Sequence, residues 1–300
     1  MRRGILLTGA YYSGKKWISH HLKDAGTLPF FHEPLHPQSP PGLPIREFRN
    51  IFTFVENDPG NPFTQKVTQY MNGVTPWREA FNKGVDWKDR FSVIKKSYMR
   101  RKAFARGPVL VKCPFSVFSI DYYIDQLDFD VVFSLRNPLD LAATAKDIGT
   151  TIDFRELSVS TELINHCFPL LKRLARTCGD ANLSPVESMT HYWIFCYTFA
   201  LKLIRTRRNS DHLHFVSLTQ LNQDPVREFG KLFSQMEKSI NHLNTNPQSM
   251  QAVKSESQKK LKVWTREKSL SILTKREQQY ITEKTSQLHR EIEKETGLVL

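Results

Sequence analysis

Short, uninterrupted apolar runs recur along this chain. Four of them have the length and composition of strands. They cover residues 5–8, 109–112, 131–135 and 214–218. A continuous apolar run fits a strand that is buried on both faces, so we expect all four to lie in a parallel sheet.

Helical patterns, with apolar positions three and four residues apart, separate and follow these runs. The predicted helices cover residues 15–25, 88–104, 116–127, 138–148, 161–177, 185–208, 225–240 and 275–296. Strands that alternate with helices are typical of an α/β domain whose parallel sheet is flanked by helices on both faces. We therefore predict one such domain over residues 1–300.

Two stretches depart from this alternation. Residues 34–107 begin with several prolines, and we predict that they form an excursion that caps the sheet edge and shapes a substrate mouth. The aromatic residues of the excursion could line an apolar pocket or simply pack the cap. They include Phe48, Phe52, Phe54, Phe63, Tyr70, Trp77, Phe81 and Trp87. Residues 241–263 are rich in Asn, Gln, Ser and Lys, and we predict a mobile loop there.

Composition narrows the class of partner. The 43 basic and 30 acidic residues give a net charge of +13, which favours anionic partners. The four cysteines match neither a zinc pattern nor a disulfide framework, so we expect reduced, buried thiols. The first apolar run is too short for a signal peptide or a membrane span, which leads us to expect a cytoplasmic protein.

The stretch directly after the first strand has the pattern of a phosphate-binding loop. Residues 8–17 read TGAYYSGKKW, and their glycine spacing fits G-x-x-x-x-G-K. A nucleotide triphosphatase places Ser or Thr next, to hold Mg²⁺, but this chain has Lys16. We infer a single P-loop-type domain in which protein cations, rather than a metal, neutralise the transferred group.

A second anion site is predicted after the strand at 131–135. Arg136 precedes Asn137 and Pro138, and Pro138 fits the first turn of a helix. This arrangement puts a guanidinium and free backbone amides at one helix N-terminus. Thr144 lies about two turns further on, at a spacing that can bring its hydroxyl beside Arg136.

Together the two motifs resemble those of the sulfotransferases that use 3′-phosphoadenosine 5′-phosphosulfate (PAPS), in particular the carbohydrate and bacterial members. The resemblance implies that Arg136 and Thr144 bind the 3′-phosphate of PAPS and of its product, 3′-phosphoadenosine 5′-phosphate (PAP). It also implies that residues 12–17 bind the 5′-phosphosulfate, with Trp17 at the adenine. The residues at these loop positions are Tyr12, Ser13, Gly14, Lys15, Lys16 and Trp17.

Further resemblances extend the predicted site. Lys112 in the run VKCP matches a strand-end Lys that contacts the transferring sulfuryl group. Trp264 and Arg266 lie in a stretch similar to the loop that covers the nucleotide. The chain departs from the family at Tyr12, where a Lys or Arg is usual. Either Lys15 supplies the missing cation, or the loop binds a nucleotide that it turns over poorly.

The run HEPLH at residues 32–36 contains the zinc-protease pattern H-E-x-x-H. That pattern needs both His on one continuous helix, and Pro34 between them excludes it. Interpreted as the end of a strand followed by a turn, the segment resembles instead the E-P-L stretch of carbohydrate sulfotransferases. This resemblance implies that Glu33 is the base that deprotonates an acceptor hydroxyl. His32 and His36 remain alternative bases.

The resemblance thus implies metal-independent, in-line transfer of a sulfuryl group from PAPS to a hydroxyl of a carbohydrate or small molecule. Glu33, Lys15 and Lys112 would be the catalytic residues. One alternative is a P-loop kinase that uses ATP and Mg²⁺. The other is a basic protein that binds nucleic acid or heparinoids, although we expect no nucleic-acid partner because the basic runs lack interleaved aromatic residues.

Overall fold

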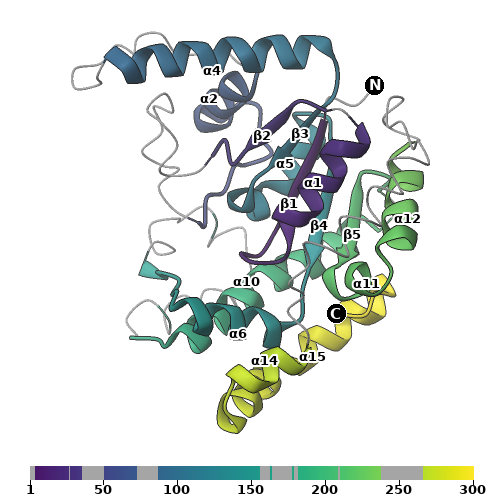
Figure 1. The fold of residues 1–300 in the computed structure, drawn as a ribbon. Coiled ribbons are helices and arrows are strands. Elements are labelled where there is room, and N and C mark those ends of the chain that lie inside the picture. Colours follow the sequence, from purple (N-terminus) through teal and green to yellow (C-terminus); the bar gives the residue numbers. More distant parts are fainter. Residues whose placement is uncertain are drawn as a thin grey trace.

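A computed structural model describes residues 4–26, 28–35, 51–72, 87–155, 163, 178, 182–208, 210–237 and 266–300. At its centre lies a five-stranded parallel sheet with the strand order β2-β3-β1-β4-β5 (Figure 1). The strands are β1 (Gly4–Gly9), β2 (Phe30–His32), β3 (Val109–Lys112), β4 (Phe129–Leu135) and β5 (Leu213–Ser217). The predicted parallel sheet is confirmed, and β2 is a short strand that no apolar run of its own predicted.

β1 is the central strand, and it pairs with β3 on one side and β4 on the other. In this register Leu7 lies opposite Lys112 of β3 and Val132 of β4. The carboxyl ends of the three strands therefore meet at one edge of the sheet. Ligands of open α/β sheets bind outside this edge, so the loop after β1 is well placed to form a site with residues that follow β3 and β4.

Helices surround the sheet. They are α1 (Lys15–Gly26), α2 (Pro62–Met71), α4 (Trp87–Arg106), the 3₁₀ helix η2 (Pro114–Ser119), α5 (Ile120–Asp125), α6 (Pro138–Ile148), α10 (Pro185–Thr206), α11 (Leu218–Gln223), α12 (Pro225–Glu237), α14 (Arg266–Ile272) and α15 (Lys275–Thr296). Successive strand residues point to opposite faces. Leu6 packs in one apolar cluster with Trp193 of α10, whereas Leu7 packs in another with Ile18 of α1 and Phe229 of α12. Both faces of the sheet are therefore covered, as predicted.

Local signals fix both ends of α6. The side chain of Asn137 accepts the backbone N–H of Leu139, Pro138 occupies the first turn, and Gly149 ends the helix with φ of +67°. These are the usual start and stop signals of a helix. The observed bounds are those that the sequence predicted.

The described part of the excursion at 34–107 packs against the sheet domain. Phe52 is fully buried in the larger apolar cluster, with Val67 and Met71 of α2. The hydroxyl of Tyr70 donates to the carbonyl oxygen of Pro34 at 3.0 Å. Phe52 and Tyr70 therefore pack the cap, whereas Phe54 lines a pocket of about 230 Å³.

Several predictions lie outside the described residues. They include the loop at 241–263, nearly all of the helix at 161–177, and Phe48, Trp77 and Phe81 of the excursion. Among the described residues, no helix has the length and hydropathy that would suit a bilayer crossing.

Candidate functional site

The backbone of the loop between β1 and α1 lies very close to Ser134 and Leu218. Gly9 has φ of +134°, and a Cβ there would lie 2.5 Å from the backbone oxygen of Ser134. Gly14 has φ of +83°, and a Cβ there would lie 2.5 Å from Cδ1 of Leu218. Only glycine combines these φ values with so little space. The loop is therefore held against the ends of β4 and β5.

Tyr12 and Glu33 share an uncommon backbone conformation. They have φ of +58° and +46°, and Asp128 is the remaining non-glycine residue of the described part with a positive φ. This left-handed region is disfavoured for residues with a Cβ. Backbone strain of this kind tends to gather at functional sites, and here it falls on two of the predicted site residues.

The side chain of Lys15 turns back into the loop. Its Nζ donates to the carbonyl oxygens of Gly9, at 3.0 Å, and Ala10, and to Oγ of Ser13 at 3.1 Å. The side chain is fully buried, and burial together with the nearby charge of Lys112 lowers the pKa of Lys15 to about 7. Lys16, in contrast, is exposed.

Lys112 and Glu33 form an ion pair where β3 and β2 end. Nζ of Lys112 lies 2.7 Å from Oε1 of Glu33 and 3.0 Å from Nε2 of His32. The backbone N–H of Glu33 also donates to the carbonyl oxygen of Lys112 at 2.7 Å. A side-chain bond and a backbone bond thus hold the carboxylate beside the ammonium. His32 itself is largely exposed.

The loop and this ion pair lie close enough for their charges to act on one another. The charges of Lys112 and Glu33 both act on the pKa of Lys15, as do Cys196 and Cys113. Burial raises the pKa of Cys113 to about 11 and that of Cys196 to about 12. Both cysteines are free and buried, as predicted for reduced thiols.

Arg136 joins the loop to the end of β4. Its guanidinium donates to the carbonyl oxygen of Tyr12, and Oγ of Ser134 donates to the carbonyl oxygen of Ser13. Arg136 is largely buried, and this burial lowers its pKa, with Asp140 acting in the opposite direction. The second predicted anion site therefore touches the first one directly.

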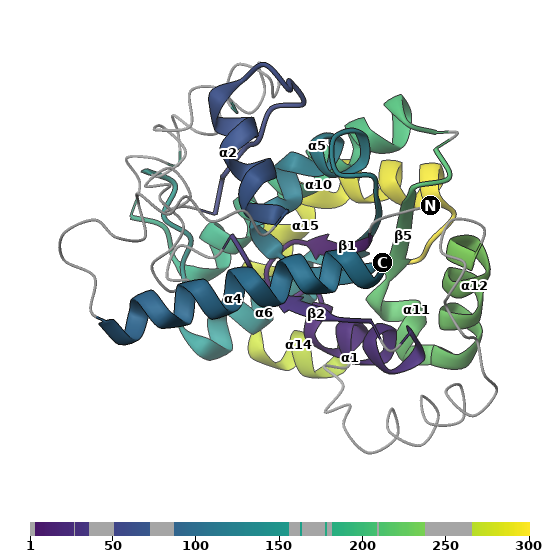
Figure 2. The same cartoon turned by 90° about the horizontal axis from the view of Figure 1, so that it is seen from above.

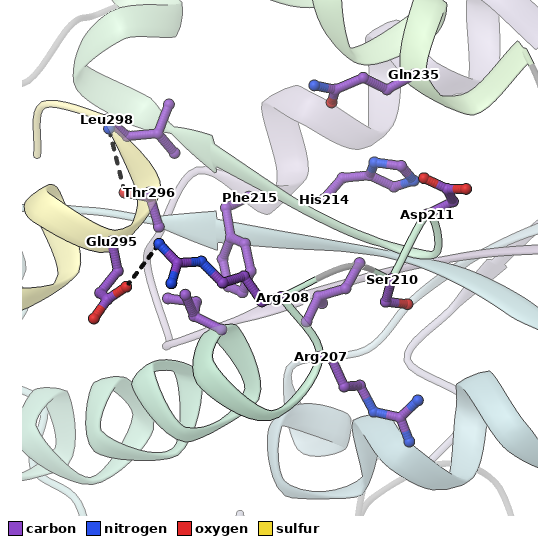
Figure 3. Close-up of a pocket in the computed structure, with 12 residues that line it drawn as sticks. Arg207, Arg208, Ser210, Asp211, His214, Phe215, Gln235, Glu295, Thr296 and Leu298 are labelled. Carbon is purple, nitrogen blue, oxygen red and sulfur yellow. Dashed lines mark hydrogen bonds and ion pairs between the residues drawn. The ribbon is translucent and has the colours of Figure 1, made fainter.

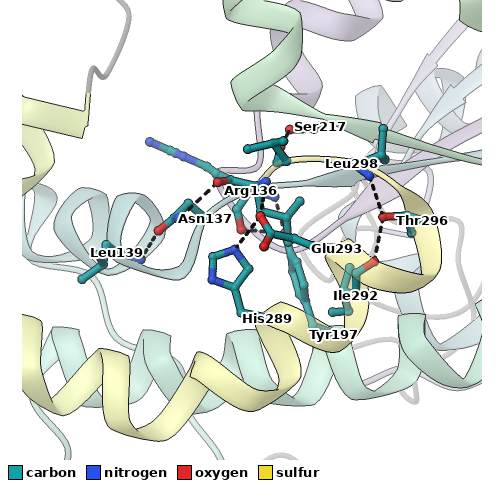
Figure 4. Close-up of polar contacts among 12 residues, drawn as sticks. Arg136, Asn137, Leu139, Tyr197, Ser217, His289, Ile292, Glu293, Thr296 and Leu298 are labelled. Carbon is teal, nitrogen blue, oxygen red and sulfur yellow. Dashed lines mark hydrogen bonds and ion pairs between the residues drawn. The ribbon is translucent and has the colours of Figure 1, made fainter.

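Residues of α10 hold the backbone of Arg136 (Figure 4). The hydroxyl of Tyr197 accepts the N–H of Arg136 and donates to its carbonyl oxygen at 3.0 Å. Nε1 of Trp193 donates to the same carbonyl at 2.9 Å. The rings of Tyr197 and Trp193 are stacked, with centroids 4.2 Å apart. These contacts could not be predicted from the sequence, because a buried aromatic residue on a helix is most often only part of a core.

The C-terminal turn also contacts the start of α6. Nδ2 of Asn137 donates to the carbonyl oxygen of Leu300 at 3.2 Å, and Oγ of Ser217 donates to that of Val299. Figure 4 shows this turn, after α15, next to Arg136. Asn137 thus fixes the position of the helix N-terminus with its side chain while capping it.

The other predicted binding residues lie less centrally. Thr144 is buried on the second turn of α6, where its hydroxyl donates to the carbonyl oxygen of Asp140 at 2.8 Å. Trp17 packs between His21 and Phe229, and its buried Nε1 has no hydrogen-bond partner. Arg266 is exposed at the start of α14.

Two predicted residues cannot be located. Trp264 and His36 lie outside the described residues. His32 and Glu33 stand at the end of a strand and in the turn that follows it, so the segment is not the helix that a zinc-protease pair requires.

A pocket of about 360 Å³ lies elsewhere, beside β5 (Figure 3). Arg208 is directed toward Glu295 on one side of it, and His214 lies beside Asp211 on the other. Arg208 and Glu295 are 3.9 Å apart. None of Lys15, Glu33, Lys112 or Arg136 lines this pocket, so it is separate from the candidate site.

No protein-family model matches this chain, and no curated protein matches its sequence. Solved structures with a similar fold include the sulfotransferase domain from the curacin biosynthetic pathway (12% identity, TM-score 0.43, covering 95% of this chain and 98% of that one). Sulfotransferase STF9 from Mycobacterium avium has 12% identity and a TM-score of 0.46, over 95% of this chain and 76% of its own. Retinol dehydratase in complex with androsterone and the inactive cofactor PAP has 13% identity and a TM-score of 0.40, over 100% and 83%.

Proposed function

We propose that this protein is a sulfotransferase that moves the sulfuryl group of PAPS to a hydroxyl of a carbohydrate or small molecule. One observation carries the proposal. The phosphate loop, Arg136 and the Glu33–Lys112 pair gather at the carboxyl ends of neighbouring parallel strands, and they are linked by hydrogen bonds and by charge. An anion-binding loop beside a second cation and a carboxylate suits transfer of an anionic group to an alcohol.

The donor set fits a ligand with two separate phosphate groups. The first turn of α1 leaves its backbone N–H groups without acceptors inside the helix, and the helix dipole favours an anion there. At the start of α6 the N–H of Leu139 is already bonded to Asn137 and Pro138 has no N–H, so the guanidinium of Arg136 and the helix dipole supply the attraction for an anion there. We assign the 5′-phosphosulfate to the first position and the 3′-phosphate to the second. The unpartnered Nε1 of Trp17 offers a further donor next to the loop.

In the proposed reaction the acceptor oxygen attacks sulfur while the bond from sulfur to the bridging phosphate oxygen breaks. The acceptor proton passes to Glu33, and PAP leaves with the electron pair of the broken bond. Lys112 lies 2.7 Å from Glu33 and is placed to offset negative charge on the oxygens around the transferring sulfur. Orientation and electrostatics, rather than covalent chemistry with the protein, would supply the rate acceleration.

The Tyr12 position separates this loop from the family pattern. Lys15 fills the space behind the loop with bonds to Gly9, Ala10 and Ser13. In the proposal Lys112 is therefore the main cation at the sulfuryl group, and Lys15 contributes charge from beneath the loop. The amides of the first turn of α1 provide the remaining stabilisation.

The proposal is tested by isothermal calorimetry with PAP. The wild-type chain should bind PAP, and Arg136→Ala should bind it at least about tenfold more weakly, because a hydrogen bond to a charged group contributes roughly 1.5–3 kcal/mol. Arg155→Ala is the matched control, since Arg155 is an exposed arginine that pairs with Asp153 two residues away. Thermal unfolding of each variant shows whether it is folded.

Two results would overturn the assignment. One is a wild-type protein that does not bind PAP but binds ATP with Mg²⁺, which would favour a kinase. The other is a folded Arg136→Ala variant with unchanged affinity for PAP. If PAP binds as expected, a direct assay of sulfuryl transfer from PAPS to simple sugars and phenols would identify the class of acceptor.

A further inference from the structure

Helix α4 carries a large share of the excess positive charge. Its 20 residues include eight Lys or Arg and one Asp, a net charge of +7 out of +13 for the whole chain. Neither the nucleotide nor the transfer step uses this charge, because the candidate site is built from other elements. A segment this basic needs an anionic partner or remains a solvated surface.

The exposed face of α4 combines cations with apolar side chains. Lys95, Lys102 and Arg106 are exposed and share one side of the helix, since they are seven and four residues apart. Tyr98 and Met99 lie between them along the helix and are 62% and 54% exposed. Nζ of Lys102 lies 6.0 Å from the centroid of the Tyr98 ring. Tyr98 is the most exposed large apolar side chain of the described residues, and Met99 lies next to it.

The other side of α4 is fixed to the domain. The ring of Phe104 stacks on Phe31 of β2 with centroids 5.8 Å apart, and it also meets Phe129 at 6.3 Å. Figures 1 and 2 both show α4 along the outside of the molecule. The cationic face is therefore held outward, where a broad surface can reach it.

We propose that α4 docks this protein on an anionic phospholipid bilayer. Lysine and arginine side chains are attracted to acidic headgroups, and clusters of four to eight of them on a helix are typical of such docking. Tyr98 and Met99 then enter the boundary between headgroups and acyl chains, which is where aromatic and apolar residues of interfacial helices lie. A sulfated glycan would satisfy the cations but leave Tyr98 and Met99 in water. The apolar pair is what favours the bilayer.

Docking leaves the candidate site accessible. Phe129, which Phe104 contacts, is the first residue of β4, whereas Arg136 follows the last one. The docking helix thus packs near the amino end of a strand whose carboxyl end belongs to the site. Vesicle binding should therefore be independent of PAP, and the proposal stands or falls separately from the proposed reaction.

The test is sedimentation of the full chain with vesicles. The wild type should bind vesicles of phosphatidylcholine and phosphatidylserine, and not vesicles of phosphatidylcholine alone. The variant Lys95→Glu/Lys102→Glu/Arg106→Glu should bind the acidic vesicles about 100-fold more weakly, given roughly fivefold for each cation. The variant Tyr98→Ser/Met99→Ser should also bind more weakly, with an unchanged dependence on salt.

A matched control reverses three exposed cations on another helix. Lys275→Glu/Arg276→Glu/Arg290→Glu on α15 changes the net charge by the same amount and should bind within a few-fold of the wild type. Circular dichroism and thermal unfolding show that each variant is folded. The proposal fails if the wild type does not bind the acidic vesicles, or if the α15 variant loses as much binding as the α4 variant. It also fails if Tyr98→Ser/Met99→Ser binds normally while soluble heparin displaces the vesicles, because the face would then suit polyanionic chains.

Discussion

The buried ammonium of Lys15 makes the stability of this protein depend on pH in a predictable direction. In the folded chain the pKa of Lys15 is lowered from 10.5 to about 7, first by burial and then by the charge of Lys112. Between these two values the unfolded chain holds a proton on Lys15 that the folded chain lacks. The free energy of unfolding therefore rises with pH between about 7 and 10.5. The stability that Lys15 contributes is fully present above pH 10.5 and is lost as the pH falls toward 7.

The magnitude follows from the size of the shift. A change of one pH unit within this window alters the free energy of unfolding by at most about 1.4 kcal/mol, and the whole shift corresponds to roughly 5 kcal/mol. Lys15→Met removes the titrating group while keeping most of the side-chain volume. The wild type should therefore gain roughly 2 kcal/mol relative to Lys15→Met between about pH 8 and about pH 9.5.

Urea denaturation of both proteins at several pH values measures this difference. Cys113 and Cys196 titrate in the opposite sense, because burial raises their pKa values, but both proteins carry them and their effect cancels in the comparison. Lys16→Met is the control, since Lys16 is exposed and its loss should leave the slope unchanged. Parallel stability curves for wild type and Lys15→Met would refute the reasoning. They would show that Lys15 keeps its proton when the chain folds.

Two further predictions concern the reaction and the support of Arg136. Glu33→Gln should lower the turnover number by a factor of about 10²–10⁴ with little change in affinity for PAP. His32→Asn should retain most of the turnover. The reverse pattern would assign the base to His32. Tyr197→Phe should destabilise the fold by about 1–3 kcal/mol and weaken PAP binding, because it removes the hydroxyl that bonds to the backbone of Arg136. Tyr123→Phe is its control, since the buried hydroxyl of Tyr123 bonds to Ser116, which lies outside the site. Equal loss of PAP affinity in both variants would contradict the assigned role of Tyr197.

The sequence predicts those parts of the fold that local patterns determine. The strand at 109–112 and the helix at 138–148 have the predicted bounds, because a continuous apolar run and a pair of helix end signals mark them. Strand β2 has only three residues, and it exists because its backbone pairs with β3, some 80 residues further along the chain. A run so short has no periodicity of its own, so pairing over that distance decides it.

In the candidate site, too, local patterns predict some features and long-range contacts decide the others. The loop at 8–17 and Arg136 could be identified because each follows a strand and each has a recognisable spacing of glycine, proline and charge. The contacts that fix them could not, since the hydroxyl of Tyr197 reaches Arg136 across 61 residues and Ser134 reaches Ser13 across 121. Nothing near Tyr197 in the sequence distinguishes it from the other aromatic residues of α10.

The orientation of the Lys15 side chain also bears on which group supplies positive charge in a loop that has Tyr12 in place of the usual Lys or Arg. The loop adopts a left-handed backbone conformation at Tyr12, and the carbonyl oxygens of Gly9 and Ala10 face the side-chain nitrogen of Lys15. Lys15 donates to both of these carbonyls, so its hydrogen bonds stabilise the shape of the loop before any ligand binds. An anion above the loop would favour the protonated form of Lys15 and raise its pKa again. Lys15, which replaces the usual cation, would thus become charged when the ligand binds. Proton uptake by the protein should therefore accompany PAP binding above pH 7.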